Sequence, residues 1–260
     1  RDVVWKNPGE TPNNGKDDDK NGYVDDVYGW NFLGEANNEN LEYVRILKKG
    51  DDGSADYKRA KAEYDKKYPE AQQNKTRYEQ IYQNVTGADA VIAKHLNKAT
   101  YTKEEVIAIN SQDQSLLQAK AFILQMFSFD DSISAVKDQL KEGIEYFSDQ
   151  LNYNLNLEFD GRKIVGDNPD DITDKNYGNN NVVGDKKHAK HGTHVAGIVA
   201  ATRDNGKGMN GVANHVQIMT LRAVPNGDEY DKDIALAIRY AADNGAKILN
   251  TSFGKYYSPH

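Results

Sequence analysis

The chain has 260 residues, long enough for one or two domains with a buried core, and an apolar run of the roughly 18 to 20 residues that a membrane span needs is absent. Its net charge of −7 argues against non-specific nucleic-acid binding, which depends on basic patches. The absence of cysteine excludes disulfides, iron–sulfur clusters and a cysteine nucleophile.

Residues 1–40 are rich in Gly, Asn, Asp and Pro and lack periodicity, so we expect ordered loops and turns. Five carboxylates fall within the ten residues 17–26, and their mutual repulsion would be unfavourable without a cation. Calcium prefers roughly six to eight oxygen ligands, which alternate loop positions can supply. The pattern predicts a structural calcium site, with a solvated acidic turn as the alternative. The expected ligands are Asp17, Asp19, Asn21, the carbonyl of Tyr23 and Asp25, with Asp26 or a residue from elsewhere completing the shell.

Residues 41–158 have a helical pattern, because apolar and aromatic positions recur mostly every three or four residues. Thr102 and Glu105 resemble a capping box, and residues 132–151 are amphipathic. We expect an all-α insertion of four or five antiparallel helices, broken or kinked at Pro69. The apolar stripes are expected to form a core, and a partner-binding face is the alternative.

Residues 159–260 have an α/β pattern. A strand is expected over 216–224, a helix over 231–244 that ends before Gly245, and a second strand over 246–253. Strand, helix and strand form a βαβ unit and hence a parallel sheet. Both strand candidates are almost continuously apolar, as in a sheet covered on both faces.

The most informative stretch is 191–201, which reads as the start of a helix made of small residues. A histidine in its first turn would lie at the rim of the sheet and could act as a general base. His188, His191 and His194 also recur every three residues, which leaves a zinc site as an alternative. That spacing places the outer pair on nearly opposite sides of a helix, which disfavours zinc. Simple capping of a buried helix by polar residues is the third possibility.

The sequence His-Gly-Thr-His-Val-Ala-Gly at 191–197 resembles the histidine signature of the subtilisin family of serine proteases, the subtilases. The stretches 205–213 and 248–254 resemble the loop and strand that follow in that family, and 5–10 and 29–33 resemble a subgroup from Bacteroidetes-like bacteria. The resemblance implies a partial subtilisin-like parallel sheet flanked by helices, with an inserted helical subdomain. The expected boundaries are 1–40 for the N-terminal part of the catalytic domain, 41–158 for the insertion and 159–260 for the catalytic core.

By this resemblance, His191 is the catalytic base of a Ser-His-Asp triad in an endopeptidase that cleaves polypeptides. Ser252, Phe253 and Gly254 match the edge segment that pairs with the substrate backbone, and Gly227 and Asp228 match the facing segment. The carboxylates at 228 and 229 could favour basic substrate side chains, or could simply be solvated.

Two motifs of the family are absent from the 260 residues, Asp-Ser/Thr-Gly for the aspartate and Gly-Thr-Ser for the nucleophile. We therefore expect an internal piece of a longer protein that is inactive by itself. A catalytically inactive subtilase-like module that binds calcium or a protein is the alternative. The resemblance further implies a monomer that is secreted or held in the cell envelope.

Overall fold

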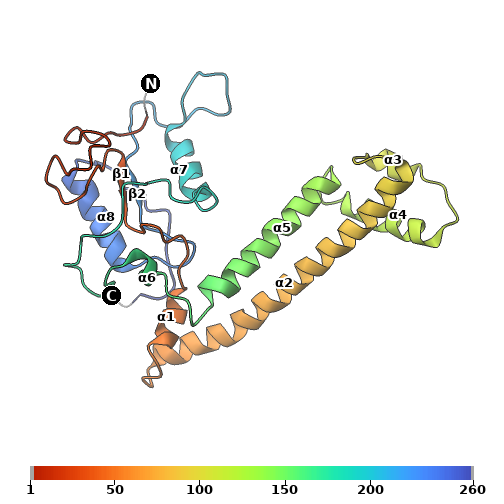
Figure 1. The fold of residues 1–260 in the computed structure, drawn as a ribbon, viewed down its shortest axis with the longest axis horizontal. Coiled ribbons are helices and arrows are strands. Elements are labelled where there is room, and N and C mark those ends of the chain that lie inside the picture. The colour runs from red at the N-terminus through yellow and green to blue at the C-terminus, as the bar shows by residue number, and fades with distance from the viewer. Residues whose placement is uncertain (1–2, 259–260) are drawn as a thin grey trace. The chain divides into compact units, whose positions relative to one another are not determined.

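The computed structural model describes residues 3–258, and the chain divides into two compact units (Figure 1). The first comprises Arg1–Lys61 and Tyr153–His260, and the second comprises Ala62–Asn152. The sequence pattern placed the helical segment at 41–158, whereas the second unit begins within the first turns of helix α2 (Ala55–Leu96).

A short parallel sheet lies at the centre of the first unit. Strand β1 (Gly29–Asn31) pairs with β2 (Thr220–Arg222), with Trp30 opposite Leu221. Helix α8 (Asp231–Asp243) packs next to β2 (Figure 1). Together they bury one apolar core, since burial of apolar side chains is the main driving force of folding. Its buried members are Trp30, Phe32, Tyr177, Ala223, Leu236, Ala237 and Tyr240.

Gly29 lets the two strands approach each other. Its φ is +122°, and a Cβ at this position would overlap the carbonyl of Thr220. Only glycine adopts this backbone conformation readily. The close contact between the two strands therefore requires glycine as the first residue of β1.

Three further helices belong to the first unit: α1 (Glu42–Lys48), α6 (Arg162–Val165) and α7 (Lys190–Ala200). The last turn of α7 is tied to the loop that follows it, because the amides of Gly211, Val212 and Ala213 donate to the carbonyls of Ala201, Ile198 and Val199. These three bonds fix the C-terminal end of the helix that carries the histidine motif.

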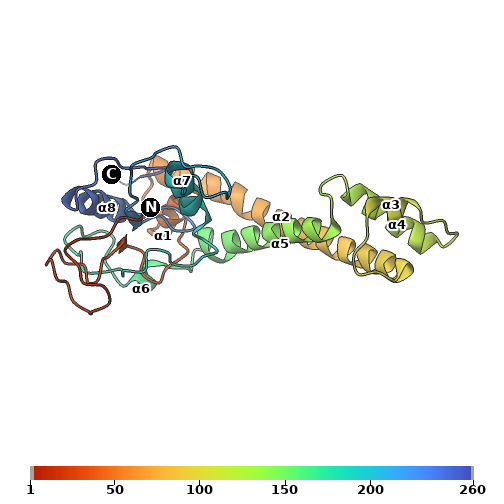
Figure 2. The same ribbon diagram turned by 90° about the horizontal axis from the view of Figure 1, so that it is seen from above.

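The second unit holds α3 (Lys103–Ile107), α4 (Gln114–Met126), α5 (Ile133–Asp149) and most of α2, and a π-helical turn (Gln150–Asn154) follows α5. Within this unit α2 and α5 run side by side in Figures 1 and 2. The predicted capping box is confirmed, since Thr102 accepts from the amide of Glu105 and Glu105 accepts from that of Thr102. A separate core includes Val85, Ile92, Val106 and Ile123, each fully buried.

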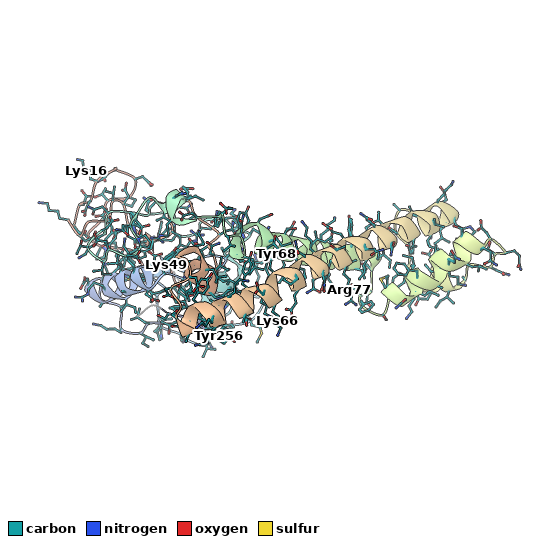
Figure 3. The ribbon with its side chains drawn as sticks, turned by 90° about the horizontal axis from the view of Figure 1, so that it is seen from below. Lys16, Lys49, Lys66, Tyr68, Arg77 and Tyr256 are labelled. Carbon is teal, nitrogen blue, oxygen red and sulfur yellow. The ribbon has the colours of Figure 1, made fainter. Side chains whose placement is uncertain are left out.

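Helix α2 continues through Pro69, so a break at this residue is wrong, and the kink that was its alternative stays a prediction. Proline removes one backbone donor, but the hydrogen bonds on either side of it keep the helix going. Lys66, Tyr68 and Arg77 lie along this helix in Figure 3.

Two strand assignments also differ from the sequence pattern. Residues 246–253 form no strand in the structure, although the run is apolar, while β1 forms in a region expected to contain only loops. The predicted helix over 231–244 is confirmed as α8, and Gly245 follows it with φ +80°. Among residues 3–258, no helix combines the length and the apolar character that crossing a membrane requires.

Candidate functional site

His191 lies in the first turn of α7 and is exposed. The next residue along the helix is Gly192, which adds no side chain beside the imidazole. Ala189, which precedes the first residue of α7, has no side chain that could cap the helix. The amide of Thr193 donates to the Ala189 carbonyl at 3.0 Å. An exposed imidazole at a helix start is accessible to a reacting group, as a general base must be.

The other two histidines of the motif do not join His191 in a metal site. His188 Nδ1 lies 2.8 Å from the carboxylate of Asp185, and His194 is exposed. The amide of Lys187 and the imidazole of His188 both lower the pKa of Asp185 by hydrogen bonding to its carboxylate. Within the described part of the chain, the single group able to hold a metal contains no histidine, so the structure gives zinc no support.

The predicted substrate segment at Ser252, Phe253 and Gly254 is exposed and has no strand partner. Asn250 Nδ2 donates to the hydroxyl of Ser252 at 3.1 Å. An exposed extended segment keeps backbone groups available for an added peptide strand.

The facing segment at Gly227 and Asp228 is contacted on one side by other residues of the same chain. Gly227 has φ +141°, and a Cβ there would overlap the carbonyl of Glu39. The carboxylate of Asp228 accepts the amide of Glu42 at 2.7 Å, which satisfies a free donor at the start of α1. Burial raises the pKa of Asp228 against the opposing effect of this bond. One oxygen of this carboxylate is therefore occupied by the amide at the start of α1, so fewer of its lone pairs are available to a basic substrate side chain.

The three predicted carboxylate ligands, Asp17, Asp19 and Asp25, do not form one group in the described part of the chain. The carboxylate of Asp17 accepts the amides of Asn21 and Gly22, and that of Asp25 accepts the amides of Asn14 and Gly15. These bonds close the loop on itself. The ring of Tyr23 packs against Trp30, Phe32 and Tyr240. Of the predicted set, Asp19 joins a different group.

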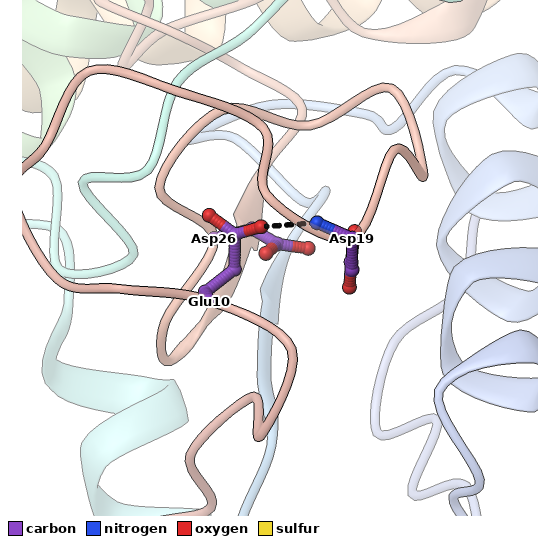
Figure 4. A group of neighbouring side chains, drawn as sticks. All are labelled: Glu10, Asp19 and Asp26. Atoms are coloured by element: carbon purple, nitrogen blue, oxygen red, sulfur yellow. Dashed lines mark hydrogen bonds between the residues drawn. The ribbon is translucent and has the colours of Figure 1, made fainter.

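Glu10, Asp19 and Asp26 bring three carboxylates together, with one oxygen of each within 4.8 Å of the others (Figure 4). We call this group the acidic cluster. Asp26 is fully buried and its Oδ2 accepts the Tyr240 hydroxyl at 2.5 Å. The dashed line in Figure 4 marks the amide of Asp19 donating to Glu10 Oε1 at 3.2 Å.

One atom of the acidic cluster lacks a partner. Glu10 is 9% exposed, and its Oε2 is buried without a hydrogen bond. A buried carboxylate oxygen is costly to leave unpaired, and a cation would satisfy it. The side-chain NH2 groups of Asn7 and Asn21 donate to the carboxylates of Asp19 and Asp26, which hold these two carboxylates in place. Carboxylate oxygens are the ligands that suit a hard cation such as Ca²⁺.

Sequence reasoning missed Glu10, because it precedes the Asp-rich loop and no fixed ligand spacing points to it. A signal was present nonetheless: an acidic residue next to glycine in the segment 5–10, which the resemblance had already singled out.

A profile of the subtilase family matches residues 140–259, which include α7 and α8. The cell wall-associated protease of Bacillus subtilis is 46% identical over 80 residues, covering 30% of this chain and 9% of that protein. A thermophilic serine proteinase of Bacillus sp. (strain AK1) is 51% identical over 65 residues, covering 25% of this chain and 16% of that protein.

A halolysin-like extracellular serine protease Nep of Natrialba magadii is 34% identical over 133 residues, covering 50% of this chain and 22% of that protein. The chain thus spans between 9% and 22% of the length of these three relatives. No solved structure matches it. The segment 140–259, with the exposed His191 on α7, is therefore similar to the subtilase family.

Proposed function

We propose that the protein containing this chain is a serine-type endopeptidase and that His191 is its catalytic base. The observation that carries the proposal is the exposed imidazole in the first turn of α7, inside the segment that matches the subtilase profile. The relatives' names, which describe serine proteases and a cell wall-associated protease, support it.

In this proposal His191 takes the proton of a serine hydroxyl as that oxygen attacks the peptide carbonyl. It then donates the proton to the leaving amine. The neutral imidazole accepts the proton in the first step, and the imidazolium formed there donates it in the second. The serine and aspartate motifs of the family are not in these 260 residues, so we expect activity only from the longer protein.

The substrate is proposed to be a polypeptide that lies in extended form beside the segments at 227–228 and 252–254. Backbone hydrogen bonding to an exposed strand edge gives affinity that is independent of sequence, and nearby side chains add selectivity. The exposed backbone of 252–254 supports this placement.

Steady-state kinetics of the natural protein test the role of His191. Removing a triad base lowers kcat by about 10⁴-fold or more, so His191→Ala should show a loss of this size. His215 is also exposed and lies outside the motif, so His215→Ala is the matched control and should keep kcat within about twofold, as is usual for an exposed site away from the chemistry. Equal kinetics of His191→Ala and wild type would contradict the assignment.

A second proposal concerns the acidic cluster, which we infer holds a structural calcium ion. Glu10, Asp19 and Asp26 would bind it, and the buried oxygen of Glu10 that has no hydrogen bond supports this. The ion would offset two of the three negative charges of the cluster and tie the loop to α8 through Asp26 and Tyr240. It is assigned no part in peptide hydrolysis.

Terbium, which replaces calcium in oxygen sites, provides the test, because Tyr240 lies within hydrogen-bond distance of the cluster and can sensitise it. We expect Tyr-sensitised luminescence that calcium displaces, and a thermal stabilisation of about 2.7 kcal/mol at a calcium concentration 100 times Kd. Glu10→Gln should abolish both effects. Asp18→Asn is the control, since Asp18 bonds Thr11 and Asn14 outside the cluster. Unchanged terbium binding in Glu10→Gln would refute the site.

We further propose a secreted or envelope-held monomer in which the helical region is an insertion in a subtilisin-like domain. The printed names of relatives, cell wall-associated and extracellular, support that location. The separate core of residues in α2 to α5 supports an inserted unit.

A further inference from the structure

The segment 226–229, which precedes α8, is held by the residues that lead into α1. Asn226 forms a parallel bridge with Asn38, and its amide donates to the Asn37 carbonyl at 2.8 Å. The amide of Glu39 donates to the Asn226 carbonyl at 3.0 Å, and that of Asp228 donates to the Asn40 carbonyl at 3.3 Å. One edge of the segment is therefore occupied along its length.

Arg45 on α1 binds the same segment from a second direction. Its guanidinium donates to the carbonyls of Asp228 at 2.8 Å and Glu229 at 2.9 Å, and to that of Asn40 at 3.2 Å. It also bonds the Glu42 carboxylate and lies 4.0 Å from the centre of the Tyr230 ring. The planar fork of arginine can make these contacts together, which an ammonium group cannot.

Arg45 is 6% exposed, so these bonds are shielded from water. Burial by itself would lower the pKa of this guanidinium, but the Glu42 carboxylate outweighs burial and raises it. The charge is therefore permanent, and charge-assisted hydrogen bonds of this kind are stronger than neutral ones.

Lys255 connects this network to the other predicted substrate segment, since it directly follows Gly254. Its ammonium donates to the Glu229 carbonyl and to Glu42 Oε2, both at 3.0 Å, and pairs with Asp231 at 2.9 Å. Glu42 thus accepts from both Arg45 and Lys255, and the two cations meet at one carbonyl, that of Glu229.

We propose that α1 is a structural part of the peptide-binding groove and that Arg45 is its positioning residue. Arg45 would fix the backbone of 227–229 and, through Glu42 and Lys255, the spacing to 252–254. This inference rests on the proposed protease function. Because an added peptide strand is recognised by backbone geometry, a shift of either segment would weaken substrate binding more than the chemical step.

The test uses the natural protein and the variant Arg45→Lys. For a peptide that extends several residues before the cut, we expect KM to rise about tenfold, because the variant loses one charge-assisted hydrogen bond. The kcat for the same peptide should stay within about twofold. A short ester that occupies only the position before the cut should be unaffected. Hydrogen exchange should also show faster exchange of the Asp228 amide, a readout that needs no activity.

Arg162→Lys is the matched control, because Arg162 is equally buried and ion-paired but bonds Asp167 and Asp233. It should lower thermal stability without changing KM for the long peptide. Glu42→Gln is a second, milder variant that keeps an oxygen acceptor and should change KM in the same direction.

The outcomes separate the two claims. An active wild type with unchanged KM and unchanged Asp228 exchange in Arg45→Lys and Glu42→Gln overturns the role of Arg45 alone. A KM increase of equal size in Arg162→Lys also overturns it, because the effect would then be general destabilisation. A wild type without peptidase activity overturns the proposed function and this inference with it, whatever the exchange rates show.

Discussion

At the scale of single residues, the structure places His191 as the pattern predicted, in the first turn of a helix and exposed, and its role as the base stays a prediction. A local pattern predicts such a residue well because its helix is defined by contiguous sequence. The acidic cluster is different. Glu10, Asp19 and Asp26 come together through loop closure over sixteen residues and a bond to Tyr240, and no local spacing encodes that.

Glu39 gives a prediction at this scale. It is 4% exposed, and burial raises its pKa, against the opposing effects of the Asn40 amide and the Arg45 charge. The folded chain therefore holds this proton more tightly than the unfolded chain. The free energy of unfolding should fall as pH rises from the usual glutamate pKa through the raised one, and Glu39→Gln should lack this contribution.

Urea unfolding followed by tryptophan fluorescence from about pH 4 to about pH 8 measures the effect, a range that begins near the usual glutamate pKa. The stability of Glu39→Gln relative to wild type should grow with pH and then level off. Glu35→Gln, at an exposed position, is the control and should show no such trend. A difference that stays constant with pH, or that shrinks as pH rises, would contradict the account.

At the scale of elements, helices were predicted better than strands. Apolar spacing anticipated α5 and α8, and side-chain chemistry anticipated the cap of α3. Strand β1 has three residues and exists because Gly29 allows close contact with Thr220, nearly two hundred residues away in sequence. The apolar run 246–253 forms no strand, because a strand needs a partner and apolar composition alone does not supply one.

Pro69 shows the same limit in a helix. The helix of 42 residues continues through Pro69, so its other interactions outweigh the roughly 3 kcal/mol that an interior proline costs. The ends of a helix thus depend on the helix propensities and contacts of many residues together. A single unfavourable residue inside a long helix does not end it.

At the scale of the whole molecule, residues 3–258 contain two separate apolar cores, one in each compact unit. Both tryptophans, Trp5 and Trp30, belong to the first unit, so their fluorescence reports on that unit alone. Separate cores allow separate cooperative unfolding, since stability is not uniform across a structure.

Ile123→Ala tests this separation, because Ile123 is fully buried in the core of the second unit. The cavity should destabilise that unit by about 2–5 kcal/mol. Helical circular dichroism should then show an earlier transition, while the tryptophan transition stays in place. Leu236→Ala, in the other core, is the converse control and should shift the tryptophan signal. A tryptophan transition that moves with Ile123→Ala would show that the units unfold together.

We propose that His191 activates the nucleophile of a serine protease that contains this chain. The most direct measurement is labelling of the natural protein by a fluorophosphonate, with the modified residue identified by mass spectrometry. The account predicts one labelled serine in wild type and in His215→Ala, and labelling slowed by at least about 10³-fold in His191→Ala. Labelling at the same rate in His191→Ala, or no labelled serine in wild type, would contradict it.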